Sequence, residues 1–132
     1  MIYLRYVTGT PVEGMDARAG FLTAAYALRD DPELPGWAAD YLEELLAWFR
    51  ENLPIPEDFT RSAARHREVD HSRGLSWFKG DAGEVLDKVA ELIALLDQFD
   101  HVVEQIETER PGYIVYDDDW QVVADPFADT PR

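Results

Sequence analysis

Cysteine is absent from the 132 residues of this chain. This absence excludes a disulfide framework, a thiol nucleophile and a zinc site built on cysteine. Basic residues are scarce, because 12 Lys and Arg stand against 27 Asp and Glu and give a net charge of -15. Nucleic acid and anionic membranes would be repelled by so much negative charge, so we expect neither as a direct partner.

Long apolar runs are also lacking. No stretch of about 18 apolar residues is present, and the opening residues do not have the pattern of a cleaved leader. We therefore expect a cytoplasmic protein. An apolar content of 46% and a charged content of 30% are typical of a globular chain. The length suits a single domain over residues 1–132, with a tail that frays from about residue 127.

The sequence lacks the usual catalytic signatures. It contains no Gly-x-Ser-x-Gly elbow, no phosphate-binding glycine loop and no His-Glu-x-x-His pattern, so we predict no catalytic residue, no metal and no cofactor. His66, Asp70 and His71 are the alternative site, at the mouth of a pocket between sheet and helices. They would serve a small-molecule-binding protein or a small hydrolase. A zinc site normally needs three protein ligands that are oriented by further hydrogen bonds, and without a His-Glu-x-x-His pattern we prefer the interpretation that these residues bind no metal.

Two long amphipathic helices are predicted. Apolar residues recur at three- and four-residue spacing from Trp37 to Leu53, and this broad aromatic stripe is expected to lie in the core. The second helix follows Asp81, which forms a capping box with Glu84, and continues to Phe99. Glu84 is also spaced to pair with Lys88 across one turn of this helix.

The other expected elements are a short helix and several β-strands. Together with the long helices they predict an α+β fold, in which a mainly antiparallel sheet of four to five strands carries the two long helices on one face. The short helix covers Phe21–Leu28, and the strands cover Met1–Thr8, Leu75–Lys79, His101–Glu109, Tyr113–Tyr116 and Trp120–Ala124.

The last two strands form a hairpin whose turn is acidic. Aromatic residues alternate with the aspartates there, and we predict a surface for a protein partner made of Tyr113, Tyr116, Asp117, Asp118, Asp119 and Trp120. A solvated tip that discourages edge-to-edge aggregation explains the same residues. The turn lacks the spaced ligands of a calcium loop, so no metal is predicted.

An arginine-rich segment interrupts the acidic chain. Between residues 57 and 73 the bases are Arg61, Arg65, Arg67 and Arg73. We expect an exposed loop here. Binding of an anion by these side chains and simple counter-charge to an acidic body both remain open.

Two segments carry a resemblance to known proteins: Leu75–Lys79 (LSWFK) and Arg110–Phe127 (RPGYIVYDDDWQVVADPF). The chain resembles a group of small bacterial proteins that are frequent in actinobacteria. The resemblance implies the α+β architecture and a bacterial cytoplasm, and it implies no activity and no site residues. Our functional hypothesis is a non-enzymatic acidic module of the immunity or inhibitor type. It would engage a basic protein, such as a nucleic-acid-binding effector, by mimicry of phosphate charge.

Overall fold

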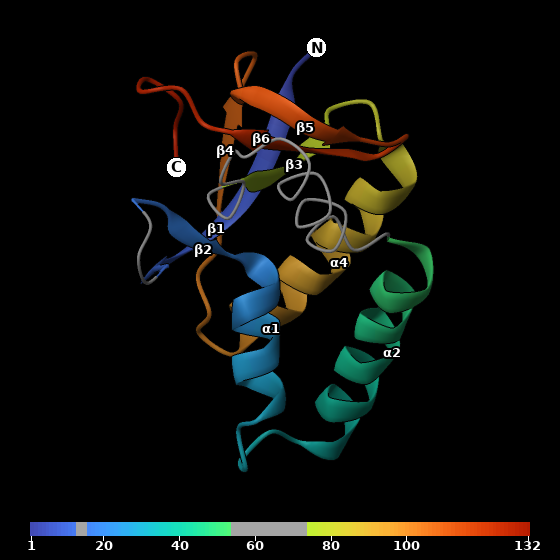
Figure 1. Cartoon of the computed structure of the whole chain (residues 1–132). Coiled ribbons are helices and arrows are strands. Elements are labelled where there is room, and N and C mark those ends of the chain that lie inside the picture. Colours follow the sequence, from blue (N-terminus) through green and yellow to red (C-terminus); the bar gives the residue numbers. More distant parts are fainter. Residues whose placement is uncertain (13–15, 54–73) are drawn as a thin grey trace, which may run out of the picture. The chain divides into compact units, whose positions relative to one another are not determined.

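The computed structural model describes residues 1–12, 16–53 and 74–132. Figure 1 shows helices and strands in the order that the sequence predicts, with one additional short strand. The elements are β1 (Tyr3–Pro11), β2 (Arg18–Gly20), α1 (Phe21–Arg29), α2 (Gly36–Asn52), β3 (Leu75–Lys79), α4 (Gly83–Gln98), β4 (Glu104–Thr108), β5 (Tyr113–Asp117) and β6 (Gln121–Asp125).

The strands form one hydrogen-bonded sheet. Its order is β2-β1-β3-β6-β5, and β4 also pairs with β1. The pairs of β1 with β2, β1 with β3, β3 with β6 and β5 with β6 are all antiparallel. The predicted α+β class with a mainly antiparallel sheet is therefore confirmed. Strand β2 was not expected, because three residues are too few to show a period.

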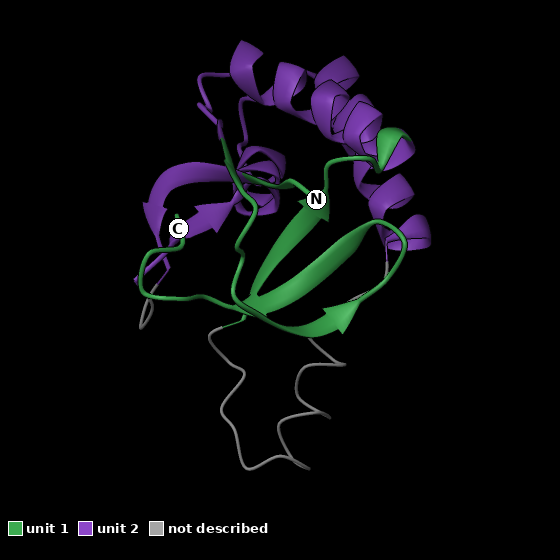
Figure 2. Cartoon of the chain, turned by 90° about the horizontal axis from the view of Figure 1, so that it is seen from above, with its two compact units in different colours: residues 1–5, 55–83, 106–132 green, residues 6–54, 84–105 purple. Residues whose placement is uncertain are grey.

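The chain divides into two compact units, which Figure 2 colours separately. Each unit combines segments that are distant in the sequence, and β1 and β4 contribute residues to both. The expectations of a single domain and of two helices on one face of the sheet stay predictions. Unit 1 contains residues 1–5, 55–83 and 106–132, and unit 2 contains residues 6–54 and 84–105.

The core of unit 1 is built on β3 and β6. Trp77 of β3 lies opposite Val122 of β6, and both are 0% exposed. Arg5 is buried with them, and its guanidinium carbon lies 5.8 Å from the centroid of the Trp77 ring. Such a cation–π contact offsets part of the cost of removing the guanidinium from water. Four consecutive residues of β6 are buried, from Gln121 to Ala124, which is typical of a central strand.

The core of unit 2 joins its three helices and β1. Phe21 of α1 makes edge-to-face contacts with Phe49 of α2 and with Tyr6 of β1, at centroid distances of 5.7 and 6.2 Å. In α4, Val85, Val89, Leu92 and Leu96 are fully buried, at the spacing that the sequence predicts. Lys88 pairs with Glu91 at 3.2 Å rather than with the expected Glu84. Helix α4 begins at Gly83, so Asp81 lies one residue before the N-cap position.

Gly112 permits the close approach of β5 and β6. Its φ is +127°, a value that L side chains rarely adopt. A Cβ at this position would meet the carbonyl oxygen of Asp125, whose residue lies opposite Tyr113 in the ladder. No residue except glycine therefore fits at the start of β5.

We predict that Gly112→Ala destabilises the protein by about 3 kcal/mol or more, because it adds backbone strain and a backbone clash. Gly83→Ala is the matched control, since a Cβ at Gly83 meets nothing within 4 Å. Its effect should be neutral or stabilising by up to about 1 kcal/mol. Urea unfolding of both variants measures the difference. Equal stability of the two would contradict the assignment.

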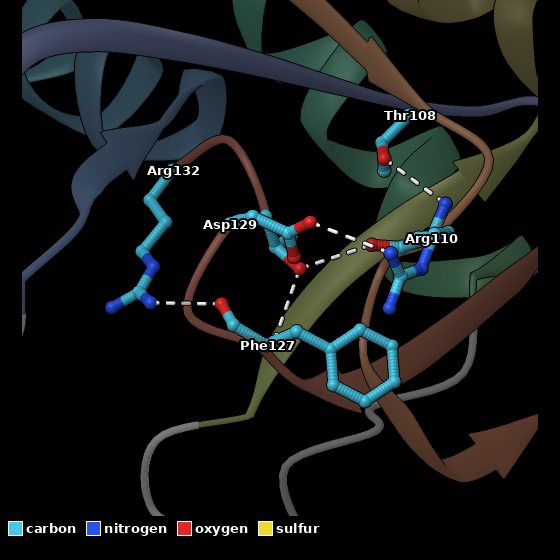
Figure 3. A network of polar contacts seen from close by, with 6 residues as sticks. Thr108, Arg110, Phe127, Asp129 and Arg132 are labelled. Carbon is cyan, nitrogen blue, oxygen red and sulfur yellow. Dashed lines mark hydrogen bonds and ion pairs between the residues drawn. The ribbon is translucent and has the colours of Figure 1, made fainter.

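The C-terminal tail folds back on the segment that precedes β5 (Figure 3). The buried Thr130 hydroxyl accepts the Phe127 backbone N–H and donates to the Arg110 carbonyl, both at 3.0 Å. Arg132 donates to the Phe127 carbonyl at 2.9 Å. The Arg110 guanidinium carbon lies 5.1 Å from the Phe127 ring centroid. These contacts involve residues 127–132, the tail that the sequence predicts to fray. Fraying is a motion that a single structure does not test, so it stays a prediction.

We predict that Thr130→Val costs about 1–2 kcal/mol, because the isosteric side chain leaves the Phe127 N–H and the Arg110 carbonyl without their partner. Hydrogen exchange at the Phe127 amide should then be faster than in the wild type. Thr23→Val is the control, since Thr23 is exposed on α1. If Phe127 exchanges as quickly in the wild type as in the variant, the tail is frayed and the network does not hold it.

Candidate functional site

The turn between β5 and β6 is organised by Asp118. Its Oδ1 accepts the backbone N–H groups of Trp120 and Gln121, each at 2.9 Å. Its Oδ2 accepts the Tyr116 hydroxyl at 2.6 Å and the Gln121 side-chain amide at 3.3 Å. A carboxylate that caps a turn in this way is fixed in place. Asp118 is therefore turned toward its own hairpin.

Burial and hydrogen bonding together shift the pKa values of Asp118 and Tyr116. Burial by itself would raise the pKa of Asp118, but the hydrogen bonds from Tyr116, Trp120 and Gln121 outweigh it and lower the pKa. Burial, followed by the hydrogen bond to Asp118, raises the pKa of Tyr116 to about 12. The carboxylate stays charged and the phenol stays protonated near neutral pH, so the bond between them persists.

The other two aspartates of the turn have different surroundings. Asp117 lies 2.6 Å from the Lys79 ammonium of β3, and the hydrogen bond between them raises the pKa of Lys79. Asp119 is exposed. Of the three acids predicted to meet a partner, one holds the turn, one is in an ion pair and one faces solvent.

The aromatic residues of the predicted surface are also separated. Tyr113 is 70% exposed at the start of β5, whereas Tyr116 and Trp120 are half-buried near the turn. Asp119 follows Tyr113 by six positions along the chain, about 20 Å in an extended strand. Tyr113 makes an edge-to-face contact with Phe127 at 4.9 Å. The predicted residues are therefore distributed along the hairpin, with the exposed Tyr113 at the start of β5 and the exposed Asp119 in the turn.

Some predicted residues lie outside the described part of the chain. They include the alternative site His66, Asp70 and His71 and all four residues of the arginine-rich segment, Arg61, Arg65, Arg67 and Arg73. Within residues 1–12, 16–53 and 74–132, no group of three or more His, Asp or Glu side chains is placed to hold a metal ion. No helix in these ranges is long and apolar enough to cross a membrane.

Sequence reasoning missed an exposed aromatic pair in unit 2. Trp37 and Tyr41 were expected in the core, but they are 59% and 36% exposed. The two residues lie one turn apart at the edge of the apolar stripe of α2. The centroid of the Trp37 ring lies 6.0 Å from that of the Phe99 ring. Asp40 follows Trp37 by three positions, and Glu44 follows Tyr41 by three positions. These exposed acidic residues are the signal in the sequence that the apolar stripe ends here.

Unit 2 also contains a groove that the sequence did not reveal. It has a volume of about 430 Å³ and lies beside α4. The α4 side of its wall is formed by Ala90, Ile93, Ala94 and Asp97. The rest of the lining is formed by Tyr6, Val102, Val103 and Gln105. A concave surface of this size is in the range of small-molecule sites.

Comparison with family models, with curated proteins and with solved structures finds no match for this chain. The resemblance to small bacterial proteins therefore stays a prediction. Function has to be argued from the surfaces themselves.

We predict that Asp118→Ala lowers the free energy of unfolding by about 1–2 kcal/mol, because two backbone N–H groups lose their acceptor. Asp118→Asn should lose less stability, since the side-chain amide oxygen of asparagine still accepts the two N–H groups. Asp119→Ala, one residue away and exposed, is the control and should change little.

The same variants test the charge of Asp118. A lowered folded-state pKa gives stability that is fully present above the ordinary value of 3.8 and is lost as the pH falls through the folded value. The advantage of the wild type over Asp118→Asn should therefore shrink in acid below that value. Urea unfolding across this pH range measures it, and a constant difference would show that the charge plays no part.

Proposed function

We propose that this chain is a non-enzymatic binding module for a basic protein, of the immunity or inhibitor type, and that the hairpin β5–β6 is its contact surface. One observation carries the proposal. Strand β5 ends the sheet order of the described residues, and it exposes Tyr113 by 70% and Ile114 by 44%. Large side chains exposed at a sheet edge are typical of interfaces, and tyrosine is a frequent anchor.

The charge around this strand supports a basic partner. Glu109 and Asp119 are exposed at its two ends, while the nearby bases Lys79 and Arg110 are both in ion pairs with aspartates. The chain as a whole carries a net charge of -15. A negative surface of this kind accelerates association with a positive one. A groove that binds nucleic-acid phosphates is one such surface, and the acidic hairpin would occupy it by mimicry of phosphate charge.

The geometry of β5 favours contact through side chains rather than by addition of a strand. The register with β6 shifts between Ile114 and Tyr116, so Val115 is the extra residue of a β-bulge. Bulges and charged ends are the devices that keep a sheet edge from pairing with another strand. The partner would therefore pack on Tyr113 and Ile114. A cytoplasmic location belongs to the same proposal.

Affinity capture from a lysate of the source organism, at low and at high salt, tests this function. The immobilised wild type should retain a basic protein at low salt and release it at high salt, because surface charges are screened over about 10 Å at 0.1 M. The double variant Tyr113→Ser/Ile114→Ser should bind the purified partner about 10–100-fold more weakly, as the loss of a hot spot does. Asp119→Lys should slow association.

Tyr26→Ser is the matched control, because Tyr26 is an aromatic residue of unit 2 that is 39% exposed. It should leave binding unchanged. Retention that is equal for the wild type and the double variant would remove the hairpin as the contact surface. Failure to retain any basic protein at low salt would count against the proposed function itself.

A further inference from the structure

The groove beside α4 is produced by the way this helix ends. Asp100, two residues after the last residue of α4, adopts a φ of 66°, in the left-handed region. The backbone N–H of His101 then bonds to the Leu96 carbonyl at 3.0 Å, and that of Asp100 bonds to the Asp97 carbonyl at 3.2 Å. These two bonds form a Schellman motif, which stops a helix and reverses the chain. Val102, Val103 and Gln105, which follow this reversal in the chain, consequently contribute to the lining of the groove.

The depth of the groove comes from small side chains on α4. Ala90 and Ala94 are one turn apart and share a face of the helix, and both line the groove. Their methyl groups leave a depression beside the larger Ile93. Val102, which is 76% exposed, and Val103 add further apolar surface to the lining. This exposed apolar lining is a surface that an apolar ligand body would remove from water.

The polar groups of the groove have one sign of charge. Asp97 lies one turn beyond Ala94 and Ile93 at the same wall, and its side chain is exposed. The uncharged polar members are Tyr6 and Gln105. Burial raises the pKa of Tyr6, so its hydroxyl stays protonated near neutral pH and adds no negative charge to the groove. The lining formed by the described residues contains no Lys, Arg or His.

We propose that this groove binds a small amphiphilic amine, an organic cation whose apolar body lies on Ala90, Ala94 and Val102 and whose ammonium group pairs with Asp97. Charge complementarity selects this class, because the charge of the groove wall and the net charge of the chain are both negative. An anion of the same shape would be repelled. A neutral analogue would gain only the apolar contact.

This inference does not depend on the proposed function. The groove belongs to unit 2, whereas the hairpin residues Tyr113 to Trp120 belong to unit 1. Neither Tyr113 nor Ile114 lines the groove, so the double variant Tyr113→Ser/Ile114→Ser should leave amine binding unchanged. Its result separates failure of one site from failure of the other.

Titration of the isotope-labelled chain with three probes of one shape tests the proposal. The probes are phenylbutylammonium, phenylbutanol and phenylbutyrate, followed by nuclear magnetic resonance of the backbone amides. The ammonium probe should bind most tightly and shift the amides of residues 90–97 and 102–105. The alcohol should bind about fivefold more weakly, the difference that a partly exposed ion pair makes. The carboxylate should bind most weakly.

Two substitutions locate the site. Asp97→Asn should weaken the ammonium probe about fivefold and leave the alcohol unchanged. Asp87→Asn is the matched control, an exposed acid of the same helix outside the groove, and it should change neither. Ala94→Leu should fill the groove and abolish binding of all three probes, while an unchanged amide spectrum elsewhere shows that the fold is kept.

Several results would overturn the inference. Equal affinity of the three probes would remove the role of charge. If Asp87→Asn and Asp97→Asn lowered the affinity for the ammonium probe equally, the net charge of the chain and not an ion pair with Asp97 would explain the binding. Shifts that fall outside residues 90–97 and 102–105, or binding that survives Ala94→Leu, would remove the groove.

Discussion

The structure of unit 1 depends on the position of β6. This strand pairs with β3 on one side and with β5 on the other, and its buried residues Val122 and Val123 are almost without solvent contact. Both of its ends are held by local hydrogen bonds. Asp118 receives the Gln121 N–H before the strand, and Thr130 receives the Phe127 N–H after it. Gly112 allows β5 to approach it closely. A central strand fixed at both ends presents the edge strand in one register, and the exposed side chains of β5 owe their arrangement to that register.

Local patterns explain why the elements were predictable and the site was not. The helices α2 and α4 are predicted by a 3.6-residue period, and the hairpin is predicted by the β-rich runs around Asp117–Asp119. Both patterns involve residues that are close together in the sequence. Asp117, Asp118 and Asp119 are chemically identical in the sequence. What distinguishes them is an ion pair between Asp117 and Lys79 of β3, two strands away in the sheet, and a turn geometry that directs the Asp118 carboxylate to two N–H groups. The Lys79 ion pair arises only when strands that are distant in the chain come together, and the turn bonds of Asp118 arise only when the hairpin adopts its particular turn.

The misplaced aromatic pair has a related cause. An amphipathic period shows which face of a helix is apolar, but it does not show how much of that face the neighbouring elements cover. The edges of a broad apolar face can therefore remain exposed. Trp37 and Tyr41 lie at such an edge of α2 and stay partly exposed. The groove beside α4 was equally hidden, because it depends on the left-handed residue Asp100. Glycine and asparagine are the usual signals of that conformation, and aspartate is also frequent in turns of other types.

The negative charge of the chain acts on both proposed ligands, but in different ways. The ion pairs among described residues are mostly exposed, for example Arg50 with Glu43 and Arg110 with Asp129, and such pairs contribute little stability. The excess of carboxylates consequently acts mainly as a field that concentrates cations near the surface. A basic protein meets this field with many charges at once, so its association is strongly screened by salt. An amine meets it with one charge while its body gains from apolar burial, which moderate salt does not screen. The salt dependence of binding therefore distinguishes a complex held mainly by long-range charge attraction from one held mainly by apolar contact.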